Sequence, residues 1–311
     1  MTADHGTTVA RVPLAGGAVL TTVRGARPGP TLALLGGVHG DEDEGVLAVH
    51  EVVREASRAP LAGTVRAVAP AHPAAWAAYS RTGPLDGENL ARCFPGDPVG
   101  GPTAQLAAAI TADVIDGADL LIDLHSAGVA YRMPLFCGFS RAGAVAERSR
   151  RAAIAFGAPL IWAHRETAPG RSLSAAADLG VPSIYAECSG GGGIRAHELA
   201  AYVRGVRSVM AHLGMQPSTK VETAAPRWVY GGGDLDAGAV SGRPGFFVSV
   251  AGAGEAVAEG SEIGRLYGFE GGLLDVVQAP APGVVMFLRR QSRVRTGDVL
   301  YVLARLEDEK E

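Results

Sequence analysis

The stretch TLALLGGVHGDEDEG, residues 31–45, decides the fold class, because it passes from a buried strand to the start of a helix. Apolar residues fill its first half, as in a strand covered on both faces, and four acidic residues then precede an amphipathic segment. The same change recurs along the chain, with strands expected at residues 31–37, 64–70, 118–126, 134–139, 159–163 and 183–188. Helices are expected at residues 44–58, 103–115, 141–156, 172–179 and 194–213. This alternation predicts an α/β fold with a mixed, mostly parallel sheet sandwiched by helices.

Composition limits the class of protein and its partners. The chain has 311 residues, 47% of them hydrophobic, which is enough for a large domain with a sizeable core and a smaller second domain. The formal net charge of −4 is spread along the sequence, so we expect a small-molecule ligand and neither nucleic acid nor a membrane surface as partner. Three cysteines without Cys-x-x-Cys spacing, no signal-like start and no long apolar run indicate a cytoplasmic protein.

The character of the sequence changes near residue 221. The segments GFFVSV, EIGRLY, LLDVVQAP, GVVMFL and DVLYVL read as short strands, and no helical pattern accompanies them. We therefore expect an α/β domain over residues 1–220 and a small all-β domain over residues 221–311. The second domain resembles the barrel-sandwich domains of biotinyl and lipoyl carriers, but its hairpin lacks the lysine that carries their cofactor, which argues against a carrier role.

Histidine and glutamate side chains follow the strands of the predicted parallel sheet. His39 and Glu42 come after the first strand, His125 ends the third and Glu187 ends the last. Ligands bind outside the carboxyl ends of such strands, so we expect these four residues to meet. One carboxylate and two imidazoles suit a catalytic zinc with three protein ligands and one water. Alternatively, residues 41–44 only complement the dipole of a helix, and His39 is an ordinary loop histidine.

Two further motifs carry candidate functional groups. The long connection SRTGPLDGENLARCFPGD, residues 80–97, contains Arg81 and Arg92, whose guanidinium groups suit a carboxylate or an oxyanion. Arg81 and Arg92 could equally be ordinary surface arginines on a loop. The segment YAECSGGGGI sets Glu187 before a glycine run, where it could also be a turn residue paired with a cation. Cys188 has no evident histidine partner, which disfavours a cysteine nucleophile.

The ordered set GGVHGDEDEG, SRTGPLDGENLARCFPGD, DLHSAG and YAECSGGGG, with the β-rich tail, resembles the succinylglutamate desuccinylase/aspartoacylase family of the zinc carboxypeptidase superfamily. The resemblance covers nearly the whole chain and is greatest to the N-acetyl-diaminobutyrate deacetylase-like branch. It implies a zinc-carboxypeptidase-like α/β fold whose C-terminal β domain shapes the mouth of the cleft.

The resemblance also implies roles for single residues. His39, Glu42 and His125 would hold one zinc ion per chain, and Glu187 would be the general base. Arg81 would polarise the scissile carbonyl, and Arg92 would hold a substrate carboxylate. Asn89 and Arg171 would be further substrate contacts. One departure concerns the substrate. The family usually reads Asn-Leu-Asn-Arg where this chain has Asn89-Leu90-Ala91-Arg92, so one amide that helps to hold the carboxylate is missing.

The activity implied by the resemblance is a zinc-dependent amidohydrolase. Such an enzyme removes a short acyl group, here acetyl, from a small N-acylated amino acid or diamino acid derivative. A zinc carboxypeptidase acting on short peptides and a non-catalytic metal- or ligand-binding relative are the alternatives. The expected partner is a small N-acyl compound, and the sequence leaves open whether the chain forms a homo-oligomer.

Overall fold

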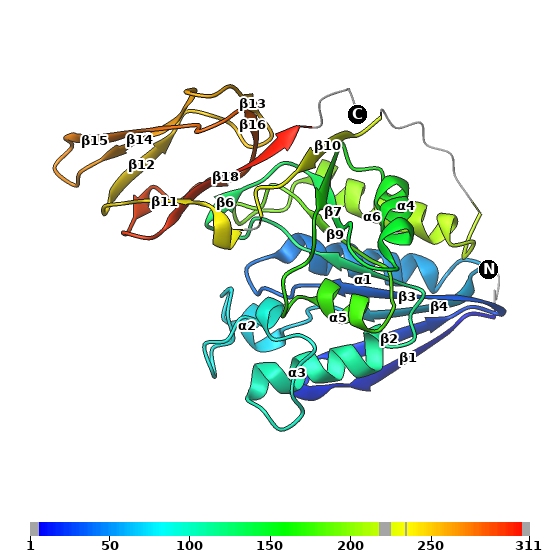
Figure 1. Ribbon diagram of the computed structural model, residues 1–311. Helices are drawn as coiled ribbons and strands as arrows, with labels where there is room; N and C mark the ends of the chain where they lie inside the picture. Colours follow the sequence, from blue (N-terminus) through cyan, green and yellow to red (C-terminus); the bar gives the residue numbers. More distant parts are fainter. Residues whose placement is uncertain (1–5, 218–224, 234, 307–311) are drawn as a thin grey trace.

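The computed structural model describes residues 6–217, 225–233 and 235–306. A 14-stranded sheet runs through it with helices on both faces, and a four-stranded sheet projects to one side (Figure 1). The path of the large sheet is β1 (Thr8–Pro13), β2 (Val19–Arg24), β4 (Ala62–Val68), β3 (Arg27–Gly36), β5 (Leu120–Leu124), β9 (Ser183–Glu187), β7 (Phe136–Ser140), β8 (Leu160–His164), β10 (Arg227–Tyr230), β18 (Val299–Leu306), β16 (Gly283–Arg289) and β13 (Ala256–Val257). Off this path, β11 (Ala239–Val240) pairs with β18 and β6 (Tyr131–Arg132) with β16. The small sheet has the order β15 (Leu273–Gln278), β14 (Glu262–Tyr267), β12 (Gly245–Ser249) and β17 (Arg293–Val294).

Helices cover the two faces of the large sheet. One face carries α1 (Asp43–Ala56), α4 (Ala146–Phe156) and α6 (Ala196–His212), and the other carries α3 (Pro102–Ile110) and α5 (Ser172–Asp178). The short elements are α2 (Pro73–Ala77), η1 (Ala15–Gly17), η2 (Leu90–Arg92), η3 (Thr111–Ile115) and η4 (Leu235–Ala237). Along β5, Ile122 packs in the core beneath the first group and Leu121 in the core beneath the second. Burial on both faces explains why this strand is a continuous apolar run.

The expected fold class is confirmed, with local differences. Each of the six expected strands is present, and β7 runs antiparallel to β9, so the sheet is mixed. The helix expected over residues 103–115 ends at Ile110 and continues as the π-helical turn η3. The hairpin of β1 and β2 was not expected, because β1 is exposed along its whole length and offers no apolar pattern.

The C-terminal strands are continuous with the α/β part of the molecule. β10 runs parallel to β8, and β18 pairs with the other side of β10. The large sheet therefore extends from the helix-covered region into the C-terminal region, as Figure 1 shows. The expected division between residues 220 and 221 lies outside the described residues and remains a prediction. None of the helices in the described part of the chain has the length and apolar character that a membrane span requires.

Candidate active site

Three neighbouring parallel strands bring the candidate residues to one edge of the sheet. β3, β5 and β9 lie side by side in parallel. His39 and Glu42 lie in the turn between β3 and α1, His125 follows β5 directly, and Glu187 is the last residue of β9. His39, His125 and Glu187 line one cavity of about 560 Å³. The strand ends thus meet as the sequence predicts.

His39, Glu42 and His125 form a compact buried cluster. The Nδ1 atom of His39 lies 2.7 Å from Oε1 of Glu42, and Nδ1 of His125 lies 2.9 Å from Oε2 of the same carboxylate. One ligand atom of each residue lies within 4.8 Å of the other two. Glu42 is 1% exposed, so water cannot stabilise its charged carboxylate and the neighbouring side chains must do so. Burial acts to raise the pKa of Glu42, but His39 and His125 hold it well below the usual range.

The hydrogen bonds of His39 show which of its nitrogens is free to bind a cation. Asn89 accepts the amide of Ala91 through Oδ1, so an oxygen, 3.1 Å away, faces Nε2 of His39. Nε2 must therefore donate. Burial and then the charge of Arg81 lower the pKa of His39 to about 4, so the neutral ring carries a single proton at pH 7. Loss of the Nδ1 proton leaves a lone pair facing Oε1 of Glu42, and a cation between these two acceptors would take the place of the proton that otherwise joins them.

His125 has the same arrangement with a carboxylate in place of the amide. Its Nε2 lies 3.1 Å from Oδ2 of Asp123, which also accepts the hydroxyl of Ser172. Burial acts to lower the pKa of His125, but Asp123 and Glu42 raise it well above the usual range. An imidazole held at Nε2 by a carboxylate can bind a metal ion through Nδ1 when the ion displaces the Nδ1 proton. Two imidazoles and one carboxylate arranged in this way fit a zinc ion with an open fourth position.

Glu187 and Arg81 stand beside the cluster. Burial raises the pKa of Glu187 well above the usual range of a glutamate, and its Oε2 is buried without a hydrogen-bond partner among the described residues. A carboxyl group in this state is suited to exchanging protons near neutral pH. Nη1 of Arg81 donates to Oε1 of Glu42 over 3.0 Å, and both Arg81 and Glu187 line the cavity.

The remaining candidates line the same cavity or lie outside its lining. Arg92 at the end of η2 and Arg171 before α5 both line it, and both contact Asp236 of η4. Asn89 is not among the residues that line the cavity, and its amide oxygen is occupied by His39 and Ala91. The structure thus places Asn89 behind a candidate metal ligand, and its expected contact with substrate remains a prediction.

Two residues of this site were not singled out from the sequence. Asp123 lies in β5 two positions before His125, which directly follows the strand, and a spacing of two in extended backbone puts both side chains on one face, a signal that sequence reasoning could have used. Asp236 lies in a short turn with no motif around it, and its sequence carries no such signal.

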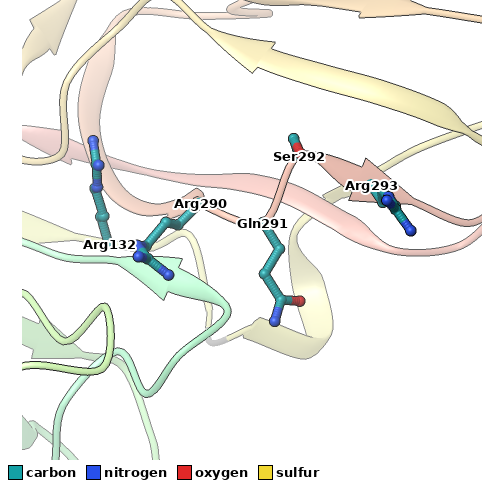
Figure 2. Close-up of a pocket in the computed structure, with 5 residues that line it drawn as sticks. All are labelled: Arg132, Arg290, Gln291, Ser292 and Arg293. Atoms are coloured by element: carbon teal, nitrogen blue, oxygen red, sulfur yellow. The ribbon is translucent and has the colours of Figure 1, made fainter.

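A second hollow of about 540 Å³ lies between β6 and the turn that joins β16 to β17 (Figure 2). Its lining residues are Arg132, Arg290, Gln291, Ser292 and Arg293. In Figure 2, Arg293 stands apart from Arg132 and Arg290, so the three guanidinium groups do not converge on one point. This hollow therefore lacks the convergent polar groups that characterise a ligand site.

Comparison with known proteins identifies the family. Residues 28–213 match the model of the succinylglutamate desuccinylase/aspartoacylase catalytic domain. The chain belongs to this family. It is 32% identical to the N-alpha-acetyl-L-2,4-diaminobutyric acid deacetylase of Halomonas elongata over 282 residues, which cover 89% of this chain and 82% of that one.

Solved structures of the family share the fold over nearly the whole chain. The succinylglutamate desuccinylase/aspartoacylase of Rhodobacter sphaeroides is 28% identical with a TM-score of 0.85, covering 97% of this chain and 95% of that one. The product-bound ectoine utilization protein EutE (DoeB) of Ruegeria pomeroyi is also 28% identical with a TM-score of 0.85, covering 92% and 88%. Membership places the chain among hydrolases that deacylate amino acid derivatives.

Proposed function

We propose that this protein is a zinc-dependent deacylase that removes a short acyl group, acetyl, from a small N-acylated amino acid or diamino acid derivative. The observation that carries the proposal is the buried cluster of His39, Glu42 and His125, with Glu187 in the same cavity. The similarity to a diaminobutyrate deacetylase supports the choice of substrate class. The absence of nucleic acid and membrane partners and the cytoplasmic location are part of the same proposal.

Different residues of the site have different roles in amide hydrolysis. A zinc ion held by the cluster would supply a Lewis acid that polarises the amide carbonyl and increases the acidity of water. Glu187 accepts a proton from the attacking water at its carboxylate and passes it to the amide nitrogen, which leaves as an amine. The guanidinium of Arg81 donates to the carbonyl oxygen as negative charge develops there.

Substrate orientation falls to two further arginines that line the cavity. Arg92 and Arg171 present guanidinium groups that suit a carboxylate of the amino acid. A substrate that binds the arginines through its carboxylate and the cluster through its amide must fit within this cavity of about 560 Å³, which favours small substrates. Leu235 and Ala237 of η4 and Phe287 of β16 also line the cavity, so a longer peptide would have to pass these side chains.

The direct test is hydrolysis by protein loaded with one equivalent of zinc. Nα-acetyl-L-2,4-diaminobutyrate, N-acetyl-L-aspartate, N-succinyl-L-glutamate and a short unblocked peptide would be offered in parallel. Released amine would be quantified by derivatisation and released acetate by proton NMR. We expect acetate and amine in equal amounts from an N-acetyl amino acid and no cleavage of the peptide. Cleavage of the peptide alone would favour a carboxypeptidase, and no cleavage of any compound would favour a non-catalytic binding protein.

A further inference from the structure

A hydrogen-bond network joins α2, α3 and the connection between them. Nε2 of His72 lies 3.3 Å from Oγ1 of Thr103, and both residues are buried. The hydroxyl of Thr103 donates to Oδ1 of Asp86 over 2.9 Å, and the backbone amide of Thr103, in the first turn of α3, donates to Oδ2 over the same distance. Asp86 lies in the long connection of residues 80–97. We therefore call His72, Thr103 and Asp86 the loop anchor.

The hydrogen bonds of the loop anchor assign the protons of His72. A carboxylate only accepts, so the Thr103 hydroxyl donates to Asp86 and its oxygen accepts from Nε2 of His72. Burial lowers the pKa of His72, although the charge of Asp86 acts to raise it, so the ring is neutral at pH 7. The lone pair of Nδ1 accepts from the backbone amide of Ala75, 3.4 Å away, at the start of α2. One imidazole thus caps α2 and ties it to α3.

The three polar groups of the loop anchor meet beside Gly83. A Cβ atom there would stand 2.6 Å from Oγ1 of Thr103, 2.7 Å from Oδ1 of Asp86 and 3.0 Å from Nε2 of His72. This close approach leaves no room for a side chain, so the backbone of Gly83 packs directly on the network. The loop anchor therefore holds the chain two residues after Arg81.

The residue before Arg81 is held by α2 and by the turn of the candidate metal ligands. The amide of Ser80 donates to the carbonyl of Ala75 over 3.0 Å, and the carbonyl of Ser80 accepts from the amide of Gly40 over 2.9 Å. Gly40 directly follows His39 and packs on α2, where a Cβ atom on Gly40 would clash with the Ala75 carbonyl group. The backbone on both sides of Arg81 is thus tied to α2, either directly or through the loop anchor.

We propose that the loop anchor positions the guanidinium of Arg81 at the candidate active site. This inference rests on the proposed deacylase function and adds to it a positioning network that does not touch the substrate, since none of its three residues is among those that line the cavity. The side chain of Arg81 is long and 38% exposed, so many conformations are open to it. Its contact with Oε1 of Glu42 requires the backbone of residues 80–83 to stay in place.

The test removes one hydroxyl group from the loop anchor. Thr103→Val deletes the side-chain hydrogen bonds to His72 and Asp86, whereas Thr103→Ser keeps a hydroxyl that can make both. Thr111→Val is the matched control, because the Thr111 hydroxyl has no hydrogen-bond partner among the described residues. Each variant would be made alone and together with Arg81→Ala. kcat and KM would be measured with zinc-loaded protein and whichever of the four test compounds the wild-type protein hydrolyses fastest.

We expect Thr103→Val to lower kcat about tenfold with little change in KM, because Arg81 donates to a carbonyl oxygen that becomes charged only in the transition state. Thr103→Ser and Thr111→Val should have kcat close to that of the wild-type protein. In the Arg81→Ala background, Thr103→Val should cost almost nothing more, because the side chain that the network positions is gone. Equal losses in both backgrounds would mean that the network only supports the fold, which would overturn the inference. An unchanged kcat in Thr103→Val would also overturn it.

A second variant interrupts the same network from the other side and serves if Thr103→Val does not fold. His72→Asn keeps an acceptor for the amide of Ala75 at the start of α2, but its side chain is too short to reach Thr103. It should lower kcat in the same way and lose that effect in the Arg81→Ala background. A loss that persists in that background would count against the inference here too.

A further measurement does not depend on activity. Amide hydrogen exchange of peptides that cover residues 78–90, followed by mass spectrometry, reports how firmly the segment around Arg81 is held. We expect faster exchange in Thr103→Val and wild-type exchange in Thr111→Val, and unchanged exchange in Thr103→Val would overturn the inference.

The outcome is separable from that of the proposed function. If the wild-type protein hydrolyses a test compound but the losses are independent of Arg81, the deacylase function stands and the positioning role is wrong. If the wild-type protein hydrolyses none of them, the proposed function is wrong, and the positioning role in catalysis falls with it even if the exchange is faster.

Discussion

Gly45 of α1 packs against the backbone of Leu124 at the end of β5, so closely that a Cβ atom on Gly45 would stand 2.3 Å from the Leu124 carbonyl oxygen. Gly36 at the end of β3 is similarly close, since a Cβ atom there would stand 2.4 Å from the carbonyl oxygen of Gly45. These two glycines let α1 start directly over the ends of β3 and β5. Glu42 immediately precedes α1 and His125 immediately follows β5, so this close approach sets the geometry of the candidate metal cluster.

Gly45→Ala should therefore weaken both the fold and metal binding. The added methyl group meets backbone atoms that cannot rotate away, and overpacking of this kind costs about 1–3 kcal/mol of unfolding free energy. Urea unfolding and elemental analysis of the purified variant would measure the two effects. Gly272→Ala is the control, because a Cβ atom there meets nothing within 4 Å. Wild-type stability and metal content in Gly45→Ala would show that α1 can shift without disturbing the cluster.

The candidate metal ligands give a prediction about the zinc content of the purified protein. Protein purified without added metal should contain close to one zinc per chain, and His39→Ala or His125→Ala should remove it, because each leaves only two of three protein ligands. His197→Ala, an exposed histidine on α6, should retain the metal. Inductively coupled plasma mass spectrometry of the three variants is the measurement. Full metal content in both ligand variants would refute the assignment.

How much of this site the sequence could predict depends on how local each contact is. His39, Glu42, His125 and Glu187 follow strands of one parallel sheet, and the topology of such sheets brings strand ends together regardless of the intervening sequence. The fold class follows from the same alternation of buried strands and amphipathic helices.

The missed contacts join parts of the chain whose proximity no local pattern encodes. Asp236 meets Arg92 only because β10 and β18 join the large sheet and place η4 over the cavity. The contact of the Asn89 amide oxygen with His39 likewise joins η2 to the turn after β3, and the expected contact of Asn89 with substrate stays a prediction. The β1–β2 hairpin carries few buried side chains and therefore no periodic signal.

Glu187 should act in proton transfer without binding metal. Glu187→Gln removes the basic carboxylate but preserves size, and we expect a loss of rate of about 10²–10⁴-fold with zinc retained, the range typical of a positioned acid or base. Steady-state kinetics and metal analysis on the same preparation would separate the two roles. Glu270→Gln, at an exposed glutamate that does not line the cavity, is the control. Near-normal turnover by Glu187→Gln would exclude this residue from the mechanism.

The cysteines should be unreactive in the folded protein. Burial raises the pKa of the Cys137 and Cys188 thiols, so at pH 8 both remain protonated, and the thiolate is the reactive form. Iodoacetamide labelling followed by mass spectrometry should modify at most the half-buried Cys93 in native protein and all three thiols in urea. The folded Cys93→Ser variant should keep its activity after treatment with iodoacetamide. Rapid labelling of Cys188 in the folded protein, with loss of activity, would support a cysteine nucleophile and contradict this prediction.

The last prediction concerns Ala91, where the family usually has asparagine. Ala91 is 8% exposed and lines the cavity beside Arg92, so an amide introduced there would reach a carboxylate held by that arginine. A hydrogen bond to a charged group contributes about 1.5–3 kcal/mol, which corresponds to at least about tenfold in affinity. Ala91→Asn should therefore raise kcat/KM for N-acetyl-L-aspartate about tenfold or more, and impair the native substrate, which we expect not to be of the N-acetyl-aspartate or N-succinyl-glutamate type. Ala91→Leu fills similar space without the amide and should give no gain. If the wild-type protein already cleaves N-acetyl-L-aspartate with kcat/KM above roughly 10⁴ M⁻¹s⁻¹, within the ordinary enzyme range, then the missing asparagine does not redirect specificity.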